Sequence, residues 1–102
     1  MYRLQPVEVR QTPIFRDWLD GLRDRRAQER IAQRIVRMQA GLLGDCKFFD
    51  RIGELRIDYG PGYRVYFVRQ GSLLILLLSG GEKSSQDRDI KRAKALAAEL
   101  EE

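Results

Sequence analysis

The polar residues most able to do chemistry lie in one stretch where polar and apolar positions alternate. Glu54, Arg56 and Asp58 alternate with apolar residues, and Arg64 and Tyr66 do so after a Gly-Pro-Gly turn. A period of two is typical of β-strands and places these five side chains on one face of a predicted hairpin. The pattern indicates an anion-binding site or a set of ion pairs across the hairpin.

Both interpretations of the two arginines follow from their chemistry. Arg64 is the best candidate for stabilising phosphate charge, because a strand holds it rigidly and its planar guanidinium group matches two phosphate oxygens. Arg56 lies on the same face and could share this role. Alternatively, both arginines pair with Glu54 and Asp58. Glu54 is in turn a candidate general base or an ion-pair partner.

A further cation lies near the predicted start of the last helix. Lys83 follows Gly80-Gly81, and backbone N–H groups at a helix start can hold a phosphate together with such a side chain. The alternative is a solvated turn. Ser84 with Asp87 three residues later predicts a capping box at this start.

Composition narrows the classes of chemistry. The chain of 102 residues has no histidine and one cysteine, Cys46. A single thiol makes no intramolecular disulfide and, without histidine, no zinc site, so we expect no metal and no cofactor. The net charge of +4 fits an anionic partner, and the basic excess lies in the first 40 residues.

The length predicts one domain spanning residues 1–102. No signal-peptide pattern is visible at the start, and the apolar run from Leu73 to Leu78 is too short to cross a bilayer. The sequence therefore predicts a cytoplasmic protein that does not enter a membrane.

The first 41 residues predict a strand and two helices. Residues 2–9 suit a strand, Thr12-Pro13 begins a helix, and Asp24 can cap a second helix that ends near Ala40. So short a connection predicts an antiparallel helical hairpin. Arginines recur at helical spacing on the second helix and could grip a nucleic-acid backbone or form a solvated face: Arg26, Arg30, Arg34 and Arg37.

The rest of the chain predicts three strands and a helix. Residues 42–51 show no period and predict a loop. A three-residue turn in the hairpin would pair Ile57 with Val65 and Arg56 with Tyr66. Residues 73–78 suit a strand buried on both faces and ended by Gly80-Gly81, and the final helix follows. The predicted fold class is α+β: an antiparallel sheet with the N-terminal helical hairpin and the C-terminal helix on one face.

Three segments carry a resemblance to a known family. The run ELRIDYGPGYRVYF at residues 54–67 resembles the central hairpin of RelE/ParE-superfamily toxins. GDCKFFDRIGEL before it, LLLSGGEKSSQDRDIKRA after it and FRDWLDGLRD at residues 15–24 resemble the addiction module killer branch, close to HigB-like and phage Gp49-like proteins. The resemblance covers nearly the whole chain, with its motifs in order.

This resemblance implies a RelE/ParE toxin-like fold and the toxin role in a type II toxin–antitoxin system. It implies a cognate helix-turn-helix antitoxin, a possible toxin–antitoxin hetero-oligomer, and a ribosome-dependent mRNA endoribonuclease activity without a metal. The alternative is a ParE-like toxin that binds and poisons DNA gyrase, because members of that branch act in this way.

The resemblance also bears on single residues. Basic residues just before the hairpin act on RNA in RelE-like members, so it implies a role for Lys47, which could instead be a solvated loop lysine. Many RNA-cleaving relatives carry an arginine at the position of Arg64. Such toxins commonly use a tyrosine or histidine near the C-terminal end, but this sequence has neither after Phe67. Gln86 and Asp87 occupy that region, which keeps the gyrase alternative open.

Overall fold

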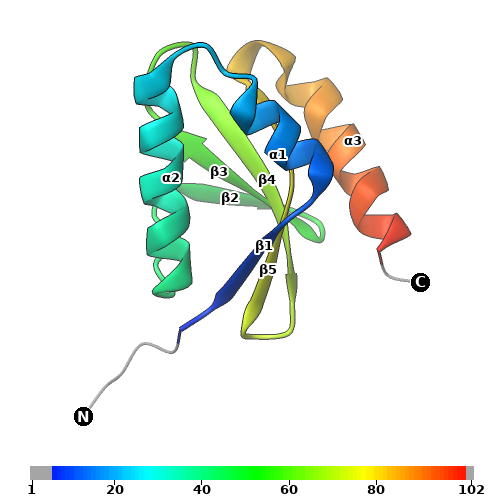
Figure 1. Ribbon diagram of the computed structural model, residues 1–102. Coiled ribbons are helices and arrows are strands. Elements are labelled where there is room, and N and C mark those ends of the chain that lie inside the picture. Colours follow the sequence, from blue (N-terminus) through cyan, green and yellow to red (C-terminus); the bar gives the residue numbers. More distant parts are fainter. Residues whose placement is uncertain (1–5, 101–102) are drawn as a thin grey trace.

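A computed structural model describes residues 6–100, so the predicted strand residues 2–5 lie outside the described part of the chain. Within residues 6–100 the fold is α+β, with a five-stranded sheet and three α-helices (Figure 1). In chain order the elements are β1 (Glu8–Gln11), α1 (Pro13–Asp20), α2 (Arg25–Gln39), β2 (Cys46–Phe49), β3 (Ile52–Ile57), β4 (Tyr63–Gln70), β5 (Leu74–Glu82), a 3₁₀ turn (Lys83–Ser85) and α3 (Gln86–Glu99).

The sheet is mixed, so the prediction of an antiparallel sheet is wrong at one edge. The strand order is β1-β5-β4-β3-β2, and β1 runs parallel to β5 while the other neighbours are antiparallel. A parallel pair needs a long connection, and most of the domain lies between these two strands. Pairing with β1 encloses β5 on both edges, which suits its continuous apolar run.

Local capping fixes the starts of α1 and α2 as the sequence predicts. The Thr12 hydroxyl accepts a hydrogen bond from the Phe15 amide at 3.0 Å. The Asp24 carboxylate accepts from the amides of Arg26 and Ala27. Each cap satisfies backbone donors that the first helical turn leaves unpaired.

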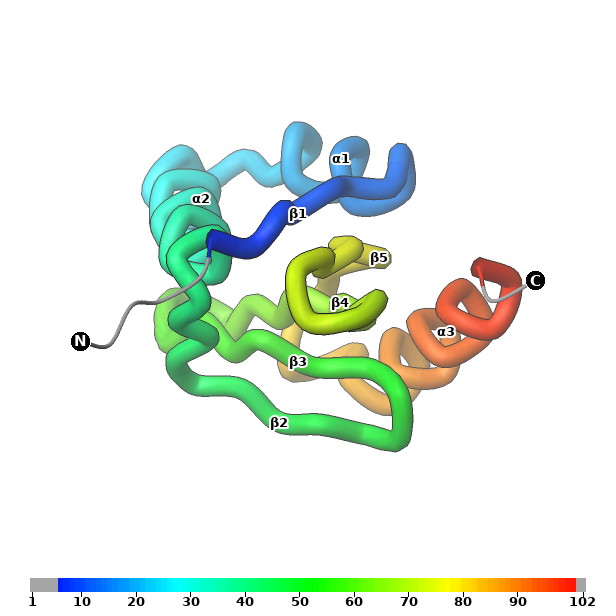
Figure 2. Tube along the Cα trace, turned by 90° about the horizontal axis from the view of Figure 1, so that it is seen from below, coloured from blue at the N-terminus to red at the C-terminus, as the bar shows by residue number. Residues whose placement is uncertain are grey.

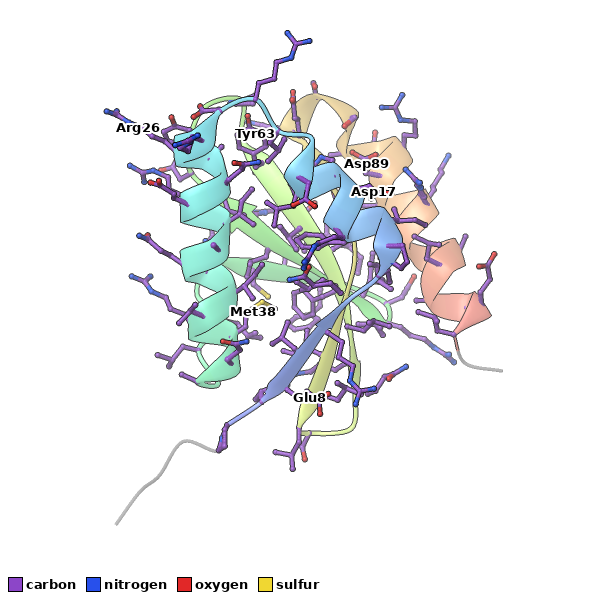
Figure 3. The ribbon with its side chains drawn as sticks, in the orientation of Figure 1. Glu8, Asp17, Arg26, Met38, Tyr63 and Asp89 are labelled. Carbon is purple, nitrogen blue, oxygen red and sulfur yellow. The ribbon has the colours of Figure 1, made fainter. Side chains whose placement is uncertain are left out.

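The face of the sheet beneath α1 and α2, here the first face, is apolar along its length. Figure 3 shows Met38 pointing from α2 toward this face. The two helices share this core, but α1 packs mainly on β5 and α2 on β1, so few contacts join them into the predicted hairpin. The fully buried residues of the core between these helices and the first face include Phe15, Ile31, Met38, Leu55, Val65, Phe67 and Leu77.

The third helix covers the opposite side of the sheet, here the second face, so the prediction of all helices on one face is wrong. Figure 2 shows α1 and α2 on one side of the strands and α3 on the other. The physical reason is a second apolar surface that must be removed from water. Ala93 and Ala97 of α3 pack there against Ile52, Tyr66, Val68 and Leu78.

Two features of the hairpin region differ from expectation. The predicted loop at residues 42–51 contains β2, which pairs with β3 at the sheet edge. The hairpin turn has five residues rather than three, so Ile57 pairs with Tyr63 and Arg56 with Arg64. Because this shift is two residues, and side chains alternate with the same period, the predicted sorting of side chains between faces is confirmed.

The two glycines near the end of β5 do not end the strand, contrary to expectation. A Cβ at Gly80 would lie 2.2 Å from the Trp18 ring on the first face. A Cβ at Gly81 would lie 2.0 Å from the Asp89 carboxylate on the second face. Glycine therefore lets helices approach the strand closely from both sides.

The predicted capping box at the start of α3 is also wrong. The helix begins at Gln86 after the 3₁₀ turn, and its N-cap residue, Ser85, makes no side-chain capping bond. Instead the Ser85 hydroxyl donates to the buried carboxylate of Asp89, at 2.5 Å. The 3₁₀ turn moves the start of the helix beyond the predicted Ser84–Asp87 pair.

Candidate functional site

The second face is polar where α3 does not cover it. Glu54 and Arg56 of β3 lie beside Tyr66 and Arg64 of β4, and their register places all four on the side that α3 occupies. Arg56 is directly opposite Arg64, and like charges in that position repel each other. A compensating negative charge is therefore needed nearby.

Glu54 supplies that charge from beneath the arginines. Its side chain is fully buried. One carboxylate oxygen, Oε1, accepts from Arg56 Nε at 3.0 Å and lies 4.0 Å from Arg64 Nε. The other, Oε2, accepts from the Tyr66 hydroxyl at 3.2 Å and from Gln86 Nε2 at 2.9 Å. A buried carboxylate is costly unless it is paired and hydrogen-bonded, and this one is both.

The two arginines direct their Nε atoms inward and line a surface hollow of about 400 Å³. The side chain of Arg56 is 34% exposed and that of Arg64 is 11% exposed. Arg64 Nη1 donates to the Tyr63 carbonyl at 3.2 Å. A guanidinium group has five N–H donors. Within residues 6–100 only one of those of Arg56 is engaged, which leaves others for an anion in the hollow.

Lys83 adds a third cation to the same hollow. Its exposed side chain lines this hollow and also a neighbouring one of about 510 Å³ at the start of α3. Its backbone amide is not available to a ligand, because it donates to the Gly62 carbonyl at 2.8 Å. The predicted phosphate contact at Lys83 can therefore come from the ammonium group but not from this amide.

Lys47 lies apart from the hollow. It belongs to β2 rather than to a loop, and it pairs in register with Glu54. Its ammonium group sits 5.0 Å from the centre of the Phe49 ring, a cation–π contact on the outer edge of the sheet. The structure therefore brings Arg56, Arg64 and Lys83 around one hollow, with Glu54 beneath, and leaves Lys47 outside it.

The walls of the hollow include residues that sequence reasoning did not assign to a site. These are Asp45 and the turn residues Gly60, Pro61 and Gly62, which line it beside Asp58 of the predicted polar face. Gln86 was considered only as a replacement for a catalytic residue, yet it joins α3 to Glu54. No sequence signal connects residues 32 positions apart, so only the fold could reveal this contact.

Tyr66 is unsuited to accept a proton. Burial, and then the neighbouring Glu54 carboxylate, raise the pKa of its phenol far above the ordinary value of 10.0. The phenol therefore stays protonated and donates to Glu54. Glu54 and Tyr66 are hydrogen-bonded to each other below the hollow, while its lining holds the cations Arg56, Arg64 and Lys83 and the exposed carboxylates of Asp45 and Asp58. As arranged, the site can bind an anion and stabilise its charge.

Residues 6–100 contain neither a cluster of potential metal ligands nor a helix suited to span a membrane. No cluster of three or more acidic or cysteine side chains in that range could hold a metal ion. Each helix in the same range is too short or too polar to cross a bilayer.

Comparison with known proteins gives one strong match. An uncharacterized protein of Haemophilus influenzae is 50% identical over 95 residues, covering 92% of this chain and 96% of that protein. The chain belongs to the family of that Haemophilus influenzae protein. No family model matches the chain. The match runs through nearly the whole of both chains, so the similarity extends over the entire domain. The description of the Haemophilus influenzae protein assigns it no activity.

Proposed function

We propose that this chain is a RelE/ParE-type toxin of a type II toxin–antitoxin pair and that it cleaves mRNA on the ribosome. The observation that carries this proposal is the hollow into which Arg56, Arg64 and Lys83 bring three positive charges. Asp45 and Asp58 are the acidic residues that line it, and Glu54 lies beneath it. These three carboxylates balance the three cations in number, so the features that favour an anion such as a nucleic-acid phosphate are the N–H donors of Arg56 that no described residue engages and the exposed ammonium group of Lys83.

The location of the resemblance supports the same proposal. The segment at residues 54–67 forms β3, β4 and the turn, and contributes both arginines. The preceding segment forms β2, and the following one forms the end of β5 and the start of α3. Three of the four segments that resemble these toxins therefore surround the hollow. That the α+β fold of this chain is specifically a RelE/ParE toxin-like fold is part of this proposal.

The proposed reaction is an in-line transfer at a phosphodiester. The 2′-oxygen of one nucleotide forms a bond to phosphorus and the bond from phosphorus to the 5′-oxygen breaks. Water in the open hollow takes the 2′-hydroxyl proton and water returns a proton to the 5′-oxygen. Arg64 and Arg56 stabilise the negative charge that grows on the phosphate oxygens, and Lys83 holds a neighbouring phosphate. Glu54 positions the guanidinium groups, because it is buried and already accepts three hydrogen bonds.

The partner in this proposal is a cognate helix-turn-helix antitoxin encoded beside the gene. The two proteins would form a hetero-oligomer in which the toxin is inactive. Co-purification of this chain with the product of the neighbouring gene supports the pairing, whereas recovery of the chain alone from such a co-expression argues against it.

One observation favours a second candidate, a ParE-like toxin that binds and poisons DNA gyrase. Glu54 and Tyr66 are buried and hydrogen-bonded to each other, so this carboxylate and this phenol are not exposed to a substrate in the hollow. Supercoiling assays with purified gyrase separate the candidates, since only the gyrase poison inhibits supercoiling.

A cleavage assay on translating ribosomes tests the main proposal. We expect wild-type protein to cut ribosome-bound mRNA and Arg64→Ala to cut it roughly 100-fold or more slowly, because a charge-stabilising donor is lost. Arg69→Ala is the matched control, since Arg69 is an exposed arginine at the end of the same strand. Unchanged cleavage by folded Arg64→Ala, or equal loss in both variants, would contradict the proposal.

A further inference from the structure

One of the helical arginines of α2 is turned toward the sheet rather than toward solvent. Arg34 is half-buried, and its guanidinium group donates to three backbone carbonyls. Nη2 reaches the carbonyls of Leu43 and Asp45, each at 3.0 Å, and Nη1 reaches that of Arg56 at 2.5 Å. The predicted solvated or nucleic-acid-binding stripe is therefore interrupted at this residue.

Two of these three carbonyls belong to residues of one wall of the hollow, Asp45 and Arg56. Asp45 lines it, and the backbone amide of Arg56 donates to the Asp45 carbonyl at 3.0 Å. Gly44 turns closely around the guanidinium group, with φ of 71° and space such that a Cβ would lie 3.1 Å from Arg34 Nη2. The Arg34 side chain thus joins α2 to the segment before β2 and to the backbone of Arg56 in β3.

The turn between β3 and β4, which contributes other lining residues, is also attached to α2. Tyr59, in the turn between β3 and β4, donates from its hydroxyl to Asp24 Oδ2 at 2.9 Å, and Arg30 lies 4.7 Å above its ring. These contacts are on the exposed surface. Two of the hydrogen bonds of Arg34 are partly buried whereas that of Tyr59 is exposed, so loss of Arg34 should have the larger effect on the hollow.

We propose that Arg34 is a positioning residue, which fixes the wall formed by Asp45 and the backbone of Arg56 so that the Arg56 guanidinium group meets a phosphodiester of single-stranded RNA. The choice of ligand rests on the proposed function, and the positioning role rests on the geometry alone. Lysine is a poor substitute, because its compact ammonium group lacks the planar fork that spans carbonyls on two segments.

The test compares Arg34→Met and Arg34→Lys with wild type, and uses Arg37→Met as the control because Arg37 is an exposed arginine on the same helix. Hydrogen exchange of the Arg56 amide, followed by NMR, reports the wall directly. Fluorescence anisotropy with a short labelled single-stranded RNA reports binding. Far-ultraviolet circular dichroism identifies any variant that has lost the fold.

We expect both Arg34 variants to exchange the Arg56 amide at least tenfold faster than wild type and to bind the RNA roughly tenfold more weakly, a loss comparable to one charge-assisted hydrogen bond. Arg37→Met should match wild type in exchange. If the methionine variant does not fold, the lysine variant decides. Wild-type exchange in a folded Arg34 variant would overturn the inference. If wild type itself binds no RNA, the proposed ligand is wrong and the exchange result still decides the positioning role.

Discussion

The two faces of the sheet are built differently. The first face is apolar along its length and is closed by α1 and α2. The second face is apolar only beneath α3, where Ile52 and Val68 lie, and is polar where Arg56 and Arg64 lie. Because β5 continues into a 3₁₀ turn before α3 begins at Gln86, the helix leaves the turn end of β3 and β4 uncovered. The first face contributes to stability along its whole length, whereas the second face has an apolar part that contributes to stability and a polar part that forms the charged hollow.

The difference also shows how a charged cluster can lie in so small a domain. Arg56 and Arg64 would repel each other across the strands, and Glu54 offsets that repulsion from below. Gln86 ties the carboxylate to α3, so the helix that packs the apolar part also supports the polar part. The two halves of the second face are therefore coupled through one hydrogen-bonded group.

The largest expected effect is on the first face. Phe67→Ala should lower the free energy of unfolding by about 3–5 kcal/mol, because a fully buried ring is removed from the main core. Val68→Ala, one residue along on the second face, is the comparison and should cost about 1–3 kcal/mol. Urea unfolding measures both. An equal or larger loss at Val68 would contradict the view that the first face dominates stability.

A smaller loss is expected where the second face becomes polar. Glu54→Gln keeps the shape of the side chain but removes the charge shared by the two arginines, and should cost about 1–3 kcal/mol in urea unfolding. Asp58→Asn is the control, since Asp58 is an exposed carboxylate on the rim of the hollow. Equal stability of wild type and Glu54→Gln would show that the carboxylate does not hold the arginines.

The smallest expected effect concerns an ion pair between α3 and the turn that joins β2 to β3. Asp50, in the turn between β2 and β3, accepts from Lys94 at 2.8 Å, and this contact lowers the pKa of the carboxyl below its ordinary value of 3.8. A lowered pKa in the folded state stabilises the fold above that ordinary value, and the contribution is lost as the pH falls through the lowered pKa. Lys94→Met should therefore reduce the loss of stability on acidification below pH 3.8. Urea unfolding across that range measures it, and parallel pH profiles for both proteins would contradict the assignment.

The periodicity of the sequence predicted much of the fold, because a helix or strand that is buried on one side has apolar residues at a regular spacing. The caps at Thr12 and Asp24 and the sorting of Glu54 and Arg64 onto one face follow from local chemistry and a period of two. The side on which α3 packs could not be predicted, because its short apolar stripe is compatible with either face. β2 was missed because four edge residues, two of them exposed, give no clear period.

The site was predicted in its residue types but not in its assembly. Alternation identified Arg56, Arg64 and Glu54 as neighbours, whereas the glycines before Lys83 lie within β5 rather than in the predicted turn. The buried state of Glu54, its bond to Gln86 and the inward turn of Arg34 depend on contacts between distant segments. Such contacts carry no local signature in the chain, so the roles of these residues emerge only when the elements pack.

The most direct measurement is the mapping of RNA 5′ ends in cells after induction of the wild-type protein and of Arg64→Ala. The account predicts new 5′ ends within translated coding regions for wild type and none above background for a soluble Arg64→Ala protein. Intact messages in cells arrested by the wild type, or the same new ends with both proteins, would contradict it.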